Sequence, residues 1–91
     1  MNRIQQLFSE KKDTILSIYM TAGYPNLHDT ATVIQELQKA GVDMIEIGLP
    51  YSDPLADGKT IQDSSTVALQ NGITIEGVFN QLRSIRKTVS I

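Results

Sequence analysis

The sequence predicts an α/β protein built around a parallel sheet, on the strength of three observations. Residues 15–20 and 44–48 are short apolar runs containing β-branched residues, the pattern of buried strands. Their centres, Ile18 and Glu46, lie 28 residues apart, which suits a β-α-β unit of about 30 residues with a right-handed crossover. Helical patterns follow the second run, so strands and helices alternate along the chain.

Two helices are predicted around the first strand. Apolar residues recur at helical spacing in residues 2–10, so a short amphipathic helix is expected there. Residues 27–40 have the same period, with Asn26 as a suitable N-cap and Gly41 as the residue that ends the helix. The expected buried stripe of this second helix is Ala31, Ile34, Leu37 and Ala40.

After the second strand, residues 49–59 form a long predicted loop with two Pro, one Gly and two Asp. Residues 60–70 are predicted to be helical, and Thr74 can cap a further helix. The expected stripe of that helix is Val78, Phe79, Leu82 and Ile85. Residues 88–91 look like the approach to a third strand, so residues 1–91 are expected to be a single domain or part of one.

The composition excludes several function classes. The chain of 91 residues has a net charge of -2 and mixed charges, so neither a nucleic-acid partner nor a membrane surface is expected. Cysteine is absent, and no apolar run approaches the roughly 18 residues of a membrane span. With His28 as the sole histidine, a zinc site built from histidines is not expected. A cytoplasmic protein is the default expectation.

Glu46 is the first chemical anomaly, because it lies inside an apolar strand. Alternation places Ile45 and Ile47 on one face, and Met44, Glu46 and Gly48 on the other. If the isoleucines meet the helix layer, the carboxylate points into the opposite, buried side, a natural setting for a general acid or base. The alternatives are a Glu at a solvated strand end, or one paired with an arginine elsewhere.

The loop after this strand is the second anomaly. Pro50 and Pro54 fix φ and stiffen the loop, and it holds two carboxylates, Asp53 and Asp57. Loops at the carboxyl ends of strands are where α/β proteins keep their sites. Ordinary turn chemistry explains the same residues equally well.

A magnesium site is a rival interpretation of the acidic residues, because carboxylate oxygens are its usual ligands. The spacing matches no calcium loop, and no metal is expected. In the magnesium interpretation, the ligand oxygens would come from Glu46, Asp53, Asp57 and Asp63.

The first strand also has a more polar face, which carries Ser17, Tyr19 and Thr21. This face is expected to meet a ligand at its carboxyl end. The alternative, and the better one on pattern alone, is that Tyr19 is a core aromatic residue.

Residues 44–62, MIEIGLPYSDPLADGKTIQ, closely resemble the signature of the tryptophan synthase alpha chain family. The shared pattern is apolar-Glu-apolar-Gly, then Pro-aromatic-Ser-Asp-Pro, then Ala-Asp-Gly and Ile-Gln. The flanks agree, because residues 21–25 (TAGYP) and 71–74 (NGIT) resemble the family's other turns. Two positions depart from the pattern: Lys59 stands where the family usually has Pro, and Tyr51 where Phe is commoner.

The resemblance implies the N-terminal part of a TIM (β/α)8 barrel, an N-terminal helix and about two β/α units. It implies the alpha subunit of a lyase of tryptophan biosynthesis that is classed as a carbon–oxygen lyase by its overall reaction. The alpha subunit's own half reaction is of the aldolase type and cleaves indole-3-glycerol phosphate to indole and glyceraldehyde 3-phosphate. Glu46 matches the residue that protonates indole C3 and acts as base toward the glycerol hydroxyl. Asp57 matches the carboxylate that accepts the indole N–H and stabilises the charge that develops there.

Further roles follow from the same resemblance. Tyr19 and Thr21 match positions that line the indole pocket. The loop matches the part that meets the beta subunit, in an assembly of two alpha and two beta chains. Pyridoxal phosphate belongs to the beta subunit, so no cofactor is expected here. The expected interface residues are Pro50, Ser52, Asp53 and Pro54.

A TIM barrel needs eight strands and about 250 residues, so a chain of 91 residues is expected to be inactive alone. A second hypothesis is a non-catalytic fragment or scaffold that binds a partner through residues 49–59. A third is another phosphate-handling barrel enzyme, such as indole-3-glycerol phosphate synthase. That enzyme relies on a catalytic Lys, whereas the inward strand positions here carry Glu and no Lys.

Overall fold

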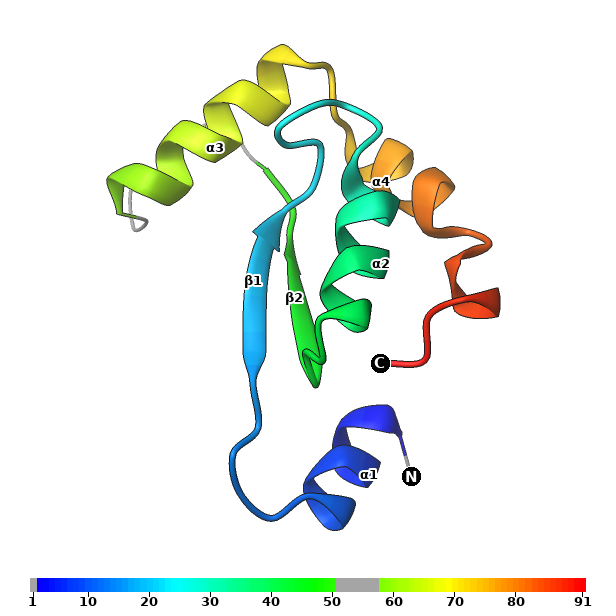
Figure 1. The fold of residues 1–91 in the computed structure, drawn as a ribbon. Coiled ribbons are helices and arrows are strands. Elements are labelled where there is room, and N and C mark those ends of the chain that lie inside the picture. Colours follow the sequence, from blue (N-terminus) through cyan, green and yellow to red (C-terminus); the bar gives the residue numbers. More distant parts are fainter. Residues whose placement is uncertain (1, 51–57) are drawn as a thin grey trace.

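The computed structural model describes residues 2–50 and 58–91. Its elements, in chain order, are α1 (Arg3–Glu10), β1 (Ser17–Thr21), α2 (Thr30–Lys39), β2 (Met44–Gly48), α3 (Lys59–Gln70), α4 (Ile75–Leu82) and the 3-10 helix η1 (Ile85–Lys87). Figure 1 shows α2 beside the two strands, α4 beyond α2, α3 near the carboxyl ends of the strands and α1 below their amino ends. The two strands are parallel, which confirms the predicted α/β class.

The core lies between the strands and α2, as the alternation predicted. Met20, Ile34 and Val89 are buried together, and the isoleucines of β2 pack against them. A second buried cluster lies between the end of β1, α3 and α4, and consists of Ala22, Ala68, Ile73 and Val78. The apolar side of the sheet therefore faces α2, and the other side is left to the polar residues.

The start of α2 differs from the prediction. Asn26 does not cap it; the helix begins at Thr30, with Asp29 in the cap position. The Asp29 carboxylate instead accepts hydrogen bonds from the side chain of Asn26, at 3.0 Å, and from its backbone N–H, at 3.3 Å. The Asn26 side chain, which was predicted to cap a helix starting at residue 27, is thereby bonded to Asp29 in a local turn. Ala40, expected in the buried stripe, is exposed.

The strands begin at an ionic anchor. The backbone N–H of Leu16 donates to the Asp43 carboxylate at 2.9 Å, and Lys11 Nζ lies 3.0 Å from the same carboxylate. The carbonyl of Leu16 accepts from the N–H of Asp43, at 3.0 Å, and of Met44, at 3.2 Å. Because the Leu16 N–H is bonded to a side chain, the strand ladder starts at Ser17, two residues later than predicted.

In the carboxyl-terminal part of the chain, the predicted N-cap of α4 is confirmed, but the burial of Phe79 and the structure of residues 88–91 differ from the prediction. Thr74 caps α4, and its hydroxyl accepts from the N–H of Gly77 at 2.9 Å. Phe79, expected to be buried, has 65% of its surface exposed. Residues 88–91 form no strand; the Gln38 amide binds their backbone, donating to the Thr88 carbonyl at 2.9 Å and accepting from Ser90 N–H at 2.7 Å.

Across residues 2–50 and 58–91, none of the helices has the length and apolar character needed to cross a membrane.

Asp43→Asn should destabilise the fold at neutral pH. The Leu16 N–H, and after it the Lys11 ammonium, hold the pKa of Asp43 below its ordinary value of 3.8. A lowered carboxyl pKa stabilises the fold above 3.8, and this contribution is lost as the pH falls through the folded-state pKa. Urea unfolding should show a difference between wild type and variant at pH 7 that shrinks below pH 3.8.

The matched control is Asp63→Asn, which removes a carboxylate from an exposed pair with Lys59 and should change stability little. An unfolding midpoint for Asp43→Asn that equals the wild-type midpoint at pH 7 would contradict the stabilising role of the contacts that Asp43 makes with Leu16 and Lys11.

Candidate functional site

The side of the sheet away from α2, here called the polar face, gathers the predicted strand residues. Its members are Ser17, Tyr19, Thr21, Met44, Glu46 and Gly48. The register pairs Tyr19 with Glu46 and Thr21 with Gly48 across the two strands. The sequence prediction that the isoleucines face the helix layer and Glu46 the opposite side is confirmed.

The surroundings of Glu46 differ from the prediction. The side chain was expected to be buried, but it is exposed, because no described residue covers the polar face over it. Its carboxylate accepts a hydrogen bond of 3.4 Å from the hydroxyl of Ser17. Ser17 precedes Tyr19 on β1, so the carboxylate leans toward the amino ends of the strands.

Tyr19 lies over the last residue of β2. A Cβ built on Gly48 would overlap the phenol oxygen of Tyr19 and would lie 2.8 Å from its Cε2. The Tyr19 side chain is 43% exposed, so it is not the core aromatic residue of the alternative prediction. A larger residue at position 48 would therefore make the half-exposed Tyr19 ring move aside.

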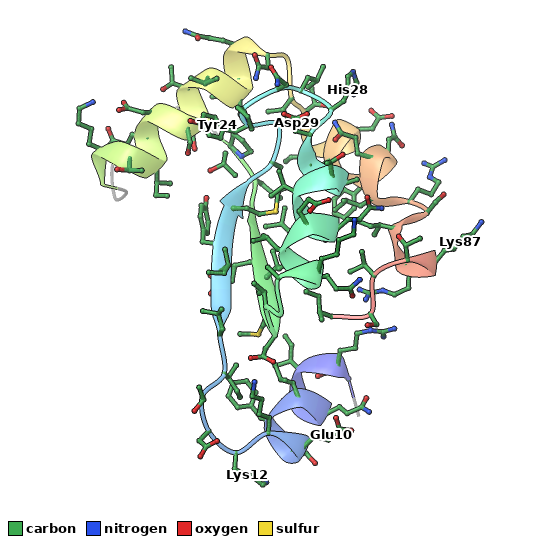
Figure 2. The ribbon with its side chains drawn as sticks, in the orientation of Figure 1. Glu10, Lys12, Tyr24, His28, Asp29 and Lys87 are labelled. Atoms are coloured by element: carbon green, nitrogen blue, oxygen red, sulfur yellow. The ribbon has the colours of Figure 1, made fainter. Side chains whose placement is uncertain are left out.

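A small pocket of about 340 Å³ opens beside Tyr19 and Thr21, where β1 meets α3. The structure thus brings together the two residues predicted to bind substrate, but Glu46 does not line this pocket. Figure 2 shows Tyr24, another of its residues, on the segment after β1, at the opposite end of the molecule from Glu10 and Lys12. The lining consists of Tyr19, Met20, Thr21, Tyr24, Pro25, Val33, Thr60, Ile61 and Ser64.

A larger groove of about 790 Å³ runs between α1, β2, α4 and the last residues of the chain. Its residues on β2 include Ile45 and Ile47, on the apolar side of the sheet, and none of its residues is a predicted site residue. Size favours this groove, but the chemistry of the side chains favours the smaller pocket. We therefore place the candidate site at the polar face and at the smaller pocket, whose lining also includes Met20 and Val33 from the apolar side of the sheet and α2.

The predicted loop residues Ser52, Asp53, Pro54 and Asp57 lie outside the described residues. Pro50 is described and half-buried, at the beginning of that segment. In the described part of the chain, no three His, Cys, Asp or Glu side chains come together as a metal site.

The segment that begins at Pro50 leads into α3, whose first residue is Lys59. Its Nζ lies 2.6 Å from Asp63 Oδ2, and this hydrogen bond, with the attraction between the charges, raises the pKa of Lys59. Proline is common at the first position of a helix. The Pro that the family usually has at position 59 would therefore also fit the start of α3, where this chain has Lys. The pair is exposed and contributes little to stability.

Sequence reasoning missed Ser64, whose hydroxyl lies 2.8 Å from that of Thr21. The two residues are 43 positions apart, and only the packing of α3 against β1 brings them together. Tyr24 was recognised as part of a motif but not as a pocket residue, because its position depends on the turn at Gly23 (φ +80°).

Comparison with known proteins gives a consistent result over the whole chain. The family model described as "Tryptophan synthase alpha chain" matches residues 4–91. The alpha chain of Flavobacterium psychrophilum is 66% identical over all 91 residues, and that of Parabacteroides distasonis is 55% identical. The chain spans only about a third of the length of these relatives, 36% and 35% respectively.

Solved structures agree with the sequence matches. Tryptophan synthase subunit alpha from Legionella pneumophila is 38% identical, with a TM-score of 0.89 over 98% of this chain and 35% of its own. A tryptophan synthase structure from M. tuberculosis gives 0.86 at 28% identity, over 97% of this chain and 37% of its own. These matches confirm the predicted fold, the N-terminal part of a TIM barrel.

Gly48→Ala should displace the half-exposed Tyr19 ring, which the new methyl group overlaps, and should destabilise the fold by up to about 1 kcal/mol. Chemical unfolding is the measurement. In a Tyr19→Ala background, Gly48→Ala should cost much less; an equal cost in both backgrounds would exclude the steric explanation.

Proposed function

The chain belongs to the tryptophan synthase alpha chain family, and on that premise we propose that the protein it is part of is the alpha-subunit lyase. The substrate is indole-3-glycerol phosphate, and the products are indole and glyceraldehyde 3-phosphate. One observation carries the proposal: in a chain whose residues 4–91 match the family, Glu46 lies on the polar face in the middle of β2, two residues before the carboxyl end of the strand. That end is where TIM barrels hold their catalytic residues.

Glu46 is the proton-transfer residue in this proposal. Its carboxyl group donates a proton to indole C3, and as a carboxylate it then takes the proton of the adjacent glycerol hydroxyl. The carbon–carbon bond breaks, its electron pair returns to the indole ring, and the hydroxyl carbon becomes the aldehyde of the second product. Glu46 gives up one proton and takes one back, so it ends the reaction in the protonation state in which it began.

Asp57 completes the charge balance. Protonation at C3 places positive charge on the ring nitrogen, and a carboxylate that accepts the indole N–H stabilises it. Asp57 directly precedes Gly58, the N-cap residue of α3. The proposal needs no cofactor of this chain, because every step is a proton transfer or a carbon–carbon cleavage.

The pocket supports the indole part of the proposal. Tyr19 offers an aromatic ring beside the strand ends, and Ile61 and Pro25 add apolar surface. A flat aromatic ligand fits an apolar pocket with a few polar groups. In this proposal Tyr19 and Thr21 contact the indole ring system.

The partner in this proposal is the beta subunit, in an assembly of two alpha and two beta chains, with pyridoxal phosphate on the beta chains. A solved Pyrococcus furiosus structure that this chain matches at 40% identity is a "tryptophan synthase complex". The interface assigned to this chain is Pro50, Ser52, Asp53 and Pro54. A cytoplasmic location is part of the same proposal.

The runner-up is a non-catalytic chain that uses residues 49–59 to bind a partner. The exposed Leu49, at 42%, favours contact with another surface. Binding to a beta subunit without any cleavage of indole-3-glycerol phosphate by the full-length protein would favour this alternative.

Glu46→Gln and Asp57→Asn, made in the full-length protein, should each lower kcat by at least about 100-fold. The glutamine cannot cycle a proton, and the asparagine carries no charge for the indole N–H. Indole release is the measurement. Glu36→Gln, at an exposed position on α2, and Asp63→Asn are the matched controls. A wild-type kcat in either test variant would remove that residue from its role.

The 91-residue chain alone should release no indole from the same substrate. It spans about a third of its relatives, and a TIM-barrel site is assembled from loops all round the barrel. Turnover by the purified 91-mer within about tenfold of the full-length protein would refute this expectation.

A further inference from the structure

We propose that Asn71 is a positioning residue that holds one wall of the small pocket in place. This wall is the turn at residues 23–25, which contributes Tyr24 and Pro25 to the lining of the pocket. Asn71 is not among the described residues that line the pocket, so it acts on a ligand through this turn. The catalytic consequence rests on the proposed function, because it takes the pocket to receive the indole ring system.

The amide of Asn71 spans the turn. Its Nδ2 donates to the carbonyl of Gly23 at 3.0 Å and to the carbonyl of Pro25 at 2.8 Å. A side-chain NH2 group has two protons, and these two carbonyls take both. Because the carbonyls stand on either side of Tyr24 along the chain, the amide fixes the backbone before and after that residue.

The position of Asn71 is itself fixed by the end of α3. Asn71 is the C-cap residue, and its backbone N–H bonds to the Val67 carbonyl at 2.9 Å. The N–H of Ile73 bonds back to the Ala68 carbonyl at 3.2 Å, and both of these residues are buried. The amide therefore projects from a piece of backbone that core packing holds in place.

The first residue of the turn rests against the same support. Gly23 has φ +80°, and a Cβ built on it would lie 2.7 Å from the Cβ of Ile73. The N–H of Gly23 donates to the hydroxyl of Thr30 at 2.9 Å, and Thr30 is fully buried. This side of the turn is closed by packing as well as by hydrogen bonds.

The pocket side of the turn depends more on the Asn71 amide. Tyr24 is 41% exposed and Pro25 is also exposed, so packing restrains these two residues less than it restrains Gly23. Without the amide, the Pro25 carbonyl turns to water, and the turn samples positions that widen or close the pocket. A ligand must then order the wall when it binds, and this ordering weakens binding.

Loss of the amide should therefore affect KM more than kcat. Glu46, the proposed proton-transfer residue, lies on β2 and outside the lining of the pocket. A change in the wall thus weakens binding of the ring system in the ground state and in the transition state alike. A loss of that kind raises KM and leaves kcat unchanged.

The test uses the full-length protein with Asn71→Asp, which keeps the shape of the side chain and removes both N–H donors. KM for indole-3-glycerol phosphate should rise about tenfold, with kcat within about twofold of wild type. Asn80→Asp is the matched control on α4. The Asn80 side-chain oxygen accepts from Arg83 at 2.8 Å, a role that a carboxylate keeps, so its KM and kcat should equal those of wild type.

Asn71→Ala separates the loss of the donors from the added charge. It removes both N–H groups without introducing a carboxylate, so it should raise KM by the same factor as Asn71→Asp. A rise in KM confined to Asn71→Asp would overturn the inference, because the charge alone would then explain it. A fall in kcat with unchanged KM would overturn it too, since a variant that is merely less folded behaves in that way.

Amide hydrogen exchange gives a second readout that does not depend on turnover. The Gly23 N–H should exchange about tenfold faster in both Asn71 variants, and as in wild type in Asn80→Asp. The N–H of Val42, which bonds to the Leu37 carbonyl at 3.2 Å beyond the far end of α2, reports opening elsewhere and should not change. Equal acceleration at Gly23 and Val42 would indicate a general loss of stability and would overturn the inference.

The outcomes separate this inference from the proposed function. Absence of cleavage by the wild-type full-length protein would refute the proposed function, and exchange at Gly23 would still decide whether Asn71 holds the turn. Cleavage by the wild-type protein, with KM and Gly23 exchange unchanged in both Asn71 variants, would overturn the positioning role and leave the proposed function standing.

Discussion

The parallel pairing of β1 with β2 is the constraint on which the rest of the structure depends. Because side chains alternate along a strand, one register places the isoleucines of β2 against α2 and Glu46 on the other side. A slip of one residue would turn Glu46 into the apolar layer, where an unpaired carboxylate is strongly disfavoured. The packing that holds α2 on the sheet is therefore also what directs Glu46.

Much of this arrangement could be predicted from the sequence, because it depends on local pattern. The bounds of β2 were predicted correctly, since a short apolar run ended by Gly48 and Pro50 leaves little freedom. The N-cap at Thr74 and the opposite faces of Ile47 and Glu46 follow from equally local rules. The motif in residues 44–62 then identified the family without any knowledge of the packing.

The errors arose where a side chain from elsewhere in the chain competes for a backbone group. β1 starts late because the Asp43 carboxylate takes the Leu16 N–H, and α2 starts late because Asp29 turns back to Asn26. The contact between Thr21 and Ser64 joins residues 43 positions apart. No local pattern encodes such pairs, because they exist only once α3 lies against the sheet.

Glu46 shows how placement and chemistry divide between different parts of a barrel. A carboxyl group cycles its proton efficiently at neutral pH where water is kept away and neighbours oppose its charge. In the described residues Glu46 is exposed, with the Ser17 hydroxyl at 3.4 Å. β2 and its register therefore supply the position and direction of the carboxylate. In the proposed mechanism, the proton chemistry of Glu46 depends on whatever covers the polar face, and in a TIM barrel that is the inward side of the other strands and their loops.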